Sequence, residues 1–294
     1  MPLNYYIQQL MNGVSKGAVY ALIAVGFALI FSVLKFSNFA HGGLISVCAF
    51  VGYYFYAIFK VNAVVSVLLT AIVGAVLGVL VDTVAFRRLR KKASNKIYYF
   101  ISSITCSILC TNILTLQFGT TFYSIPPFFA KPTFKIGSVI FMKMNLTILI
   151  VTVVLLIALS LMLNRTKLGL SIRVASMDRD TSMLMGINPD IVIVTTFLIA
   201  GALAGVSGIF FGSTYTVTPS IGNIAVKGFV ASVIGGLGSL PGAIIGAFLL
   251  GILEVALTVV VGDLITPAII FVMALLFLLV RPEGISGKYI SEKA

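Results

Sequence analysis

The sequence has few charged residues, and this scarcity excludes a water-soluble globular protein. Only 10% of its 294 residues are Asp, Glu, Lys or Arg, whereas typical soluble domains contain about 25%. Eight acidic and twenty basic side chains cannot form a polar shell around a chain of 31.3 kDa in which 60% of residues are hydrophobic. The mean hydropathy of +1.14 indicates that lipid, rather than water, covers most of the surface.

Histidine and cysteine are also scarce. His41 is the single histidine, which excludes a histidine-rich metal site. Cys106 and Cys110 lie four residues apart on one helix face, where packing is the expected role of small apolar side chains. The sequence contains no G-x-x-x-x-G-K-[ST] phosphate loop and no H-E-x-x-H zinc motif. We therefore expect no catalytic residue, no cofactor, no metal and no ATP hydrolysis by this chain.

Long apolar segments recur along the whole chain and predict an all-α membrane protein. A membrane-spanning helix needs roughly 20 apolar residues and satisfies its backbone internally, whereas a β-barrel would show short alternating strands. We expect one transmembrane domain over residues 1–294, a helical bundle with about eight or nine membrane-spanning segments. The first apolar run is interpreted as a retained helix. The candidate spans are 13–34, 37–59, 63–85, 97–119, 145–163, 191–212, 242–262 and 264–280.

One apolar piece, residues 228–239, is too short for a full crossing. It runs into a glycine-rich stretch that includes Gly235 and Gly236. Irregular backbone at membrane depth persists only where it is buried in protein or lines a cavity. We therefore predict a broken or re-entrant segment near 228–242, and leave open whether 228–239 crosses completely.

The positions of the basic residues predict the orientation. Segment 86–96 contains six basic residues and no acidic one, which places it in the cytoplasm by the positive-inside rule. Counting spans from there places 164–190 and 281–294 inside, and the N-terminus and 120–144 outside. The basic excess is thus a topology signal, and we expect no nucleic-acid partner.

The cytoplasmic loop 164–190 has the pattern of an amphipathic helix. Leu168, Ile172 and Ala175 recur at helical spacing, with charged residues between and after them. Gly186 suits a helix C-terminus, and Pro189 suits a stop before the next span. Two interpretations follow: an ordinary surface helix, or a projection that fits a groove of a partner protein.

The same loop resembles the EAA-type coupling segment of bacterial ABC importer permeases, in the version found in the LivH-type branched-chain amino acid permeases. It departs from that pattern at Val174 and Ser182, where the family usually has alanine. The matching residues are Leu168, Gly169, Arg173, Ala175, Asp178, Gly186, Ile187 and Asn188.

Three other stretches also resemble this family, at 38–42, 227–243 and 281–284, so that the resemblance covers nearly the full length. Where Gly43 stands, the family usually has an acidic residue, and any role of that carboxylate does not carry over. The resemblance implies a multi-pass permease subunit in the bacterial inner membrane that translocates branched-chain amino acids. Urea, short amides or other amino acids are alternative cargoes, and an ion-coupled secondary transporter is a less favoured mechanism.

The resemblance also implies partners. Cytoplasmic ATPase subunits would dock on the coupling loop, an external binding protein would deliver the cargo, and a second permease subunit would complete the pore. Whether that subunit is identical or different stays open. The coupling residues would be Gly169, Arg173, Ala175, Asp178 and Gly186.

Polar interruptions of the apolar runs provide candidates for the translocation path. Residues 38–43 place an amide, an imidazole and glycines where contact with lipid would be costly. Paired interruptions in two halves of a chain are typical of midplane sites in transporters, although tight turns and close packing are an alternative. The candidates are Asn38, His41, Gly235, Gly236 and Glu254.

Three further expectations concern contacts. Glu254 lies mid-span, where a charge costs roughly 2.5–3.5 kcal/mol on insertion scales, so it should face the protein interior or a partner. Asp82 is expected to reach Arg87 or Arg88. Four glycines at small-residue spacing predict a helix interface: Gly201, Gly205, Gly208 and Gly212.

Overall fold

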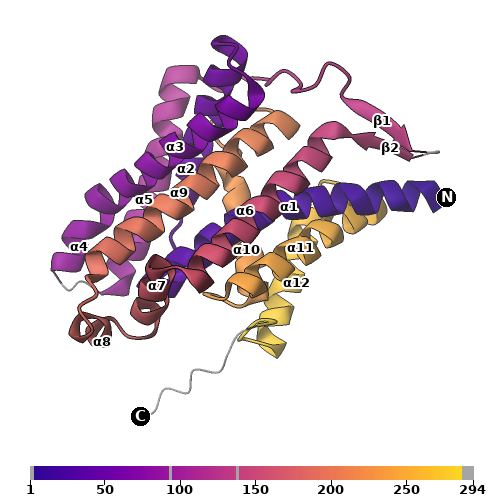
Figure 1. Ribbon diagram of the computed structural model, residues 1–294. Helices are drawn as coiled ribbons and strands as arrows, with labels where there is room; N and C mark the ends of the chain where they lie inside the picture. The colour runs from indigo at the N-terminus through magenta and orange to yellow at the C-terminus, as the bar shows by residue number, and fades with distance from the viewer. Residues whose placement is uncertain (1–2, 93–94, 137–138, 287–294) are drawn as a thin grey trace.

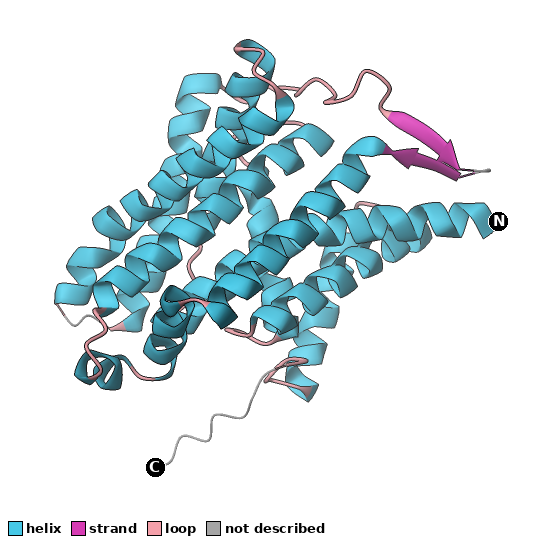
Figure 2. Ribbon diagram, in the orientation of Figure 1, coloured by secondary structure: helices cyan, strands magenta, loops and turns pink. Residues whose placement is uncertain are grey.

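The computed structural model describes residues 3–92, 95–136 and 139–286 as a bundle of helices with one small hairpin (Figures 1 and 2). Residues 93–94 of the basic segment and 287–294 of the C-terminal tail lie outside the described residues. Within the described part, seven helical segments are long and apolar enough to cross a membrane. They confirm a multi-pass helical membrane protein, and two shorter apolar helices accompany them.

The helices and strands follow the predicted spans with shifted ends. α1 begins ten residues before the predicted start of its span, and α12 is shorter than its predicted span. The helices are α1 (Leu3–Leu34), α2 (Ala40–Tyr53), α3 (Ala63–Val81), α4 (Arg87–Lys91), α5 (Lys96–Phe118), α6 (Lys143–Arg165), α7 (Lys167–Met177), α8 (Arg179–Leu184), α9 (Pro189–Thr214), α10 (Ile224–Gly235), α11 (Leu240–Val261) and α12 (Thr266–Val280). Two π-helical turns, Tyr54–Ile58 and Asp82–Phe86, extend α2 and α3.

α1 forms the centre of the bundle. Its residues 17–30 are all buried, and α6, α9, α10 and α11 pack around it. Gly13 and Gly17 permit close approach to α11, because a Cβ at either position would lie less than 3 Å from the Cα of Ile252 or Phe248. Without a hydrophobic drive between helices in lipid, such close packing is a main source of stability.

The predicted glycine interface on α9 is confirmed. Gly201 and Gly205 pack against the backbone of α3 at Gly74 and Thr70, and an added Cβ at Gly201 would lie 3.0 Å from the Cα of Gly78. Gly208 meets α2, and Gly212 meets Val217 and Ile125. Small residues on both helices therefore let α3 and α9 touch backbone to backbone.

α10 is a short helix, and its N-terminal end meets the N-terminal end of α2 inside the bundle. α10 has 12 residues, roughly 18 Å at 1.5 Å per residue, which is short of the ~30 Å hydrocarbon core. α2 together with its π-helical turn runs from Ala40 to Ile58 and is long enough to cross. Gly42 packs against Gly222, whose backbone N–H donates to the Ser46 hydroxyl at 2.9 Å. The broken segment is thus present, but its non-helical part, residues 215–220, precedes α10 and is joined to it by the 3-10 turn Ile221–Asn223.

The glycine-rich run after α10 forms a tight turn. Gly236 and Gly238 have φ angles of 108° and 86°, which side-chain-bearing residues rarely adopt. α11 therefore folds back along α10, and Gly235 packs directly against Gly242.

The two ends of the bundle differ. One end has the N-terminal end of α1 and the antiparallel hairpin β1 (Thr133–Ile136) and β2 (Val139–Met142), and the opposite end has α4, α7 and α8 (Figure 1). The hairpin was not predicted, and it stacks Phe134 on Phe141 with ring centroids 5.4 Å apart. The predicted orientation assigns the hairpin end to the outside and the basic α4 end to the cytoplasm.

Candidate functional site

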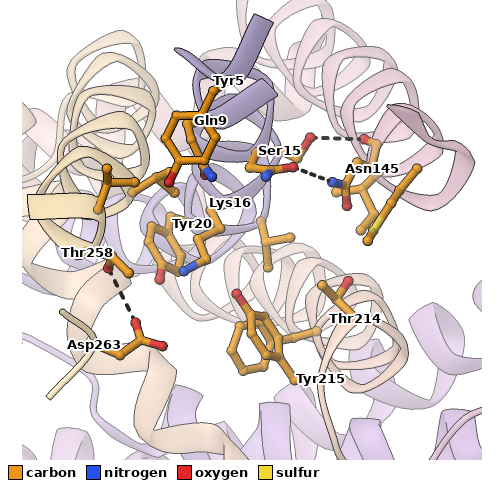
Figure 3. A pocket seen from close by; sticks show the side chains of 17 residues that line it. Tyr5, Gln9, Ser15, Lys16, Tyr20, Asn145, Thr214, Tyr215, Thr258 and Asp263 are labelled. Atoms are coloured by element: carbon orange, nitrogen blue, oxygen red, sulfur yellow. Dashed lines mark hydrogen bonds between the residues drawn. The ribbon is translucent and has the colours of Figure 1, made fainter. Parts of the chain in front are cut away.

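A cavity of about 540 Å³ lies between α1, α6, α9 and α11 at the hairpin end of the bundle (Figure 3). Both apolar and polar side chains line the cavity. The apolar wall consists of Val19, Met142, Ile148, Phe211, Val255 and Val259. The other lining residues are Tyr5, Gln9, Asn12, Ser15, Lys16, Tyr20, Asn145, Thr214, Tyr215, Thr258 and Asp263.

A buried ion cluster lies beside the inner part of this cavity, centred on Glu254. Glu254 Oε1 accepts hydrogen bonds from Lys227 Nζ at 2.9 Å and Lys16 Nζ at 3.4 Å. Its Oε2 accepts one from the Tyr20 hydroxyl at 2.7 Å. Glu254 is 4% exposed, so the prediction that it faces the interior is confirmed. Charge-assisted hydrogen bonds from α1 and α10 offset the cost of a carboxylate on a membrane-embedded helix.

The cavity ends at Tyr20. Below it, α1 is buried continuously from Ala21 to Ile30 by the surrounding helices. The cavity is therefore open toward the hairpin end and closed toward the α7 end.

Ser15 lies in a Gly-x-Ser-x-Gly sequence, the spacing of a nucleophile elbow. That elbow requires a strand-to-helix turn, whereas Ser15 lies inside α1 and donates to the Met11 carbonyl at 3.0 Å. The two glycines instead serve the contact with α11.

Asn38 and His41 lie away from the cavity, at the start of α2. Asn38 Oδ1 accepts from the Ala40 backbone N–H at 3.1 Å. The His41 ring is fully buried, fits beside Gly26, and meets the Phe27 ring at 5.2 Å. Within the described residues, neither ring nitrogen of His41 nor the Asn38 Nδ2 has a hydrogen-bond partner.

Gly235 and Gly236 lie at the opposite end from the cavity, in the turn between α10 and α11. The segment after α12 covers them, since the backbone N–H of Ser286 donates to the Gly235 carbonyl at 3.0 Å. Of the five predicted path residues, the structure therefore brings only Glu254 next to the cavity.

The predicted coupling loop forms two helices, α7 and α8, joined at Asp178. Gly169 fits directly against the end of α6 and Ala175 is buried, so these two residues fix α7 to the bundle. Arg173 and Asp178 are exposed. Pro189 does not lie between helices as expected: it opens α9, where proline suits the first turn because its missing N–H is not needed.

Asp178 and Gly186 define the ends of α8. Asp178 accepts hydrogen bonds from the Thr181 hydroxyl at 2.5 Å and from the Asp180 backbone N–H at 2.9 Å. The Thr181 hydroxyl first, and then the backbone N–H groups, hold the pKa of Asp178 below its usual value. Gly186 has a φ of 77° just after the helix, as a helix C-terminus favours.

Lys16, Tyr20 and Lys227 were not predicted as partners of Glu254. A signal was available, because Lys16 falls within the first apolar helix and Lys227 within the α10 helix. A cation there needs an internal partner. Their pairing with Glu254, however, joins positions up to 238 residues apart.

Nearly the whole sequence matches one protein family. The profile described as "Branched-chain amino acid transport system / permease component" matches residues 9–280. The high-affinity branched-chain amino acid transport system permease protein BraD of Pseudomonas aeruginosa is 34% identical, over 98% of each chain. LivH of Escherichia coli, of the same description, is 33% identical over 98% of each chain. The probable branched-chain amino acid transport permease protein LivH of Methanocaldococcus jannaschii is 27% identical, over 90% of this chain and 88% of its own.

Proposed function

Because the chain belongs to the family of branched-chain amino acid transport system permease components, we propose that it forms part of a path for leucine, isoleucine and valine across the bacterial inner membrane. In this proposal, a second permease subunit completes the path, cytoplasmic ATPase subunits supply the energy, and an external binding protein delivers the cargo. The chain itself is a multi-pass permease subunit.

The outer cavity is the observation that supports this proposal most strongly. Its volume of about 540 Å³ lies within the range of roughly 300–1,000 Å³ typical of small-molecule sites. Apolar walls from Ile148, Phe211 and Val255 suit a branched aliphatic side chain, and the polar groups suit an amino acid backbone. The packed α1 below Tyr20 makes this an outward-open, inward-closed state.

Import then requires a second state in which the closed part of the bundle opens. Asn38 and His41 lie in that part, where the Asn38 Nδ2 and both His41 ring nitrogens have no hydrogen-bond partner among the described residues. We propose that they line the path once α2 and α10 separate. Glu254 would stand at the entry to this inner part, and Gly235 and Gly236 at its cytoplasmic exit. ATP binding would bias the two states through its different affinity for each.

The α7–α8 projection is the proposed docking site of the ATPase. Its core-facing residues, Gly169 and Ala175, attach it to the bundle, while Arg173 and Asp178 face outward. Several large apolar side chains are also exposed there, which is expected of a surface that a partner covers. They are Leu170, Met177, Met183, Leu184 and Met185.

The test is uptake by proteoliposomes that contain this chain, its second permease subunit and the ATPase subunits, with binding protein outside and ATP inside. We expect uptake of radiolabelled leucine that requires ATP and survives ionophores that collapse proton and sodium gradients. Uptake that persists without the ATPase subunits and stops with ionophores would instead identify a secondary transporter. Uptake of urea or short amides, with no uptake of leucine, would show that the proposed cargo is wrong.

A further inference from the structure

The ion cluster beneath the cavity contains two ammonium groups and one carboxylate. Lys227 Nζ lies 2.9 Å from Glu254 Oε1, and Lys16 Nζ lies 3.4 Å from the same oxygen. The shorter contact already pairs Glu254 with one positive charge. Lys16 therefore brings a second positive charge that Glu254 orients but does not fully compensate.

This second charge faces the cavity. Lys16 is among the lining residues, whereas Lys227 and Glu254 are not. About a quarter of its side chain, 25%, remains exposed, and its Nζ lies 5.9 Å from the centroid of the Tyr215 ring. A cation at the inner end of a partly apolar cavity attracts an anionic group, since the low-polarity walls screen its field weakly.

A carboxylate, that of Asp263, lines the same cavity. Asp263, in the turn after α11, accepts a hydrogen bond from the Thr258 hydroxyl at 3.3 Å. Thr258 stands one turn, about 6 Å along the helix axis, beyond Glu254 on α11, and its hydrogen bond holds the Asp263 carboxylate near this part of the helix. The cavity thus presents one cationic and one anionic group, the pair that complements the two charges of an α-amino acid.

We propose that Lys16 binds the carboxylate of the cargo amino acid in this cavity, with Asp263 facing its ammonium group. The inference rests on the proposed function, because it assumes a zwitterionic cargo. The aliphatic side chain of the cargo would lie against Phe211 and Val255. Glu254 acts as a positioning residue, since it holds Lys16 and does not line the cavity. Tyr20 in turn donates to Glu254.

The experiment compares variants of the complete transporter in proteoliposomes, measuring leucine uptake and binding-protein-stimulated ATP hydrolysis. Lys16→Gln leaves the neutral Glu254–Lys227 pair intact, so it should assemble normally. We expect it to lower uptake roughly tenfold or more, as loss of a hydrogen bond to a charged group predicts, with ATP hydrolysis retained. Lys16→Arg, which keeps the charge, should retain most uptake, and Asp263→Asn should show a smaller loss.

Lys143→Gln is the matched control, because it removes an ammonium group at the outer start of α6 without altering the cavity lining. It should keep uptake within about twofold of the unmodified protein. Equal uptake by Lys16→Gln and the unmodified transporter would overturn the role of Lys16 and leave the proposed function standing. So would equal losses in Lys16→Gln and Lys16→Arg, which would indicate packing, or failure of Lys16→Gln to assemble, which would make Lys16 structural. A transporter that imports a neutral solute but no leucine would overturn the proposed function as well.

Discussion

Asp82, in the π-helical turn after α3, accepts hydrogen bonds from both terminal guanidinium nitrogens of Arg90, the one from Nη2 to Oδ2 at 3.0 Å. Both side chains are almost fully buried. Arg90 Nε also lies 3.7 Å from a carboxylate oxygen of Asp190, in the first turn of α9. One guanidinium thus joins the cytoplasmic end of α3 to the helix that follows α8.

Replacing Arg90 by methionine should destabilise the protein strongly. The change leaves the Asp82 carboxylate buried without its partner, which costs about 3–5 kcal/mol in other proteins. The double variant Asp82→Asn/Arg90→Met removes both charges and should recover most of that loss. Thermal unfolding in detergent, followed by size-exclusion chromatography, measures the effect, with Lys91→Met as the exposed neighbouring control. A double variant no more stable than Arg90→Met alone would contradict the pairing.

Gly201→Leu should separate α3 from α9. Its side chain would collide with the backbone of Gly74 and Gly78, and overpacking costs about 1–3 kcal/mol even where side chains can move. Leu198→Phe, which adds volume at an exposed position of the same helix, should leave the midpoint of thermal unfolding almost unchanged. Equal midpoints for the two variants would show that the glycine contact does not hold the helices together.

The sequence predicted the α9 interface well, because small residues at regular spacing are a local signal of close helix packing. The partner of Asp82 was predicted wrongly: the expected partners were Arg87 and Arg88, and the structure shows Arg90. Arg87 and Arg88 follow Asp82 by five and six residues, whereas neighbours on one helix face lie three or four residues apart, so nearness in sequence was a poor guide to the partner. The π-helical turn Asp82–Phe86 further changes the register of the residues that follow. Nothing in the local sequence indicated that turn.

The position of the break before α10 also could not be predicted from the local sequence. Residues 215–223 have the polar composition of an external loop, yet Ser46 donates to the Pro219 carbonyl at 2.8 Å and holds the segment inside the bundle. The contact joins positions 173 residues apart. Composition predicts which segments avoid lipid, but the choice between a surface loop and a buried break depends on such distant partners.

Charge reversal at Arg173 of the coupling segment should prevent docking of the ATPase. Arg173 is exposed on α7, so Arg173→Glu leaves the packing of Gly169 and Ala175 intact while it changes the surface offered to the partner. We expect the variant to insert in the membrane normally and to lose co-purification with the ATPase subunits. Lys167→Glu, the same charge change at an exposed position at the start of α7, is the control. Normal co-purification of Arg173→Glu would refute its assigned role.

Glu254→Gln should destabilise the bundle through repulsion between two lysines. Lys16 and Lys227 both approach Glu254 Oε1, so removing the negative charge leaves two partly buried ammonium groups close together. We expect a loss of about 1–3 kcal/mol, since the exposure of both lysines moderates the cost of an unpaired charge. Tyr20→Phe, which removes one hydrogen bond, should cost only about 1 kcal/mol.

The decisive comparison for this mechanism is the double variant Lys16→Gln/Glu254→Gln. Because it removes one of the two repelling charges, it should be more stable than Glu254→Gln alone, although it carries an additional substitution. If each substitution instead destabilised the protein by damaging packing, the two losses of stability would add in the double variant. The unfolding midpoints in detergent of Lys16→Gln, Glu254→Gln and the double variant therefore separate charge repulsion from packing damage. A double variant less stable than Glu254→Gln would exclude the repulsion between Lys16 and Lys227.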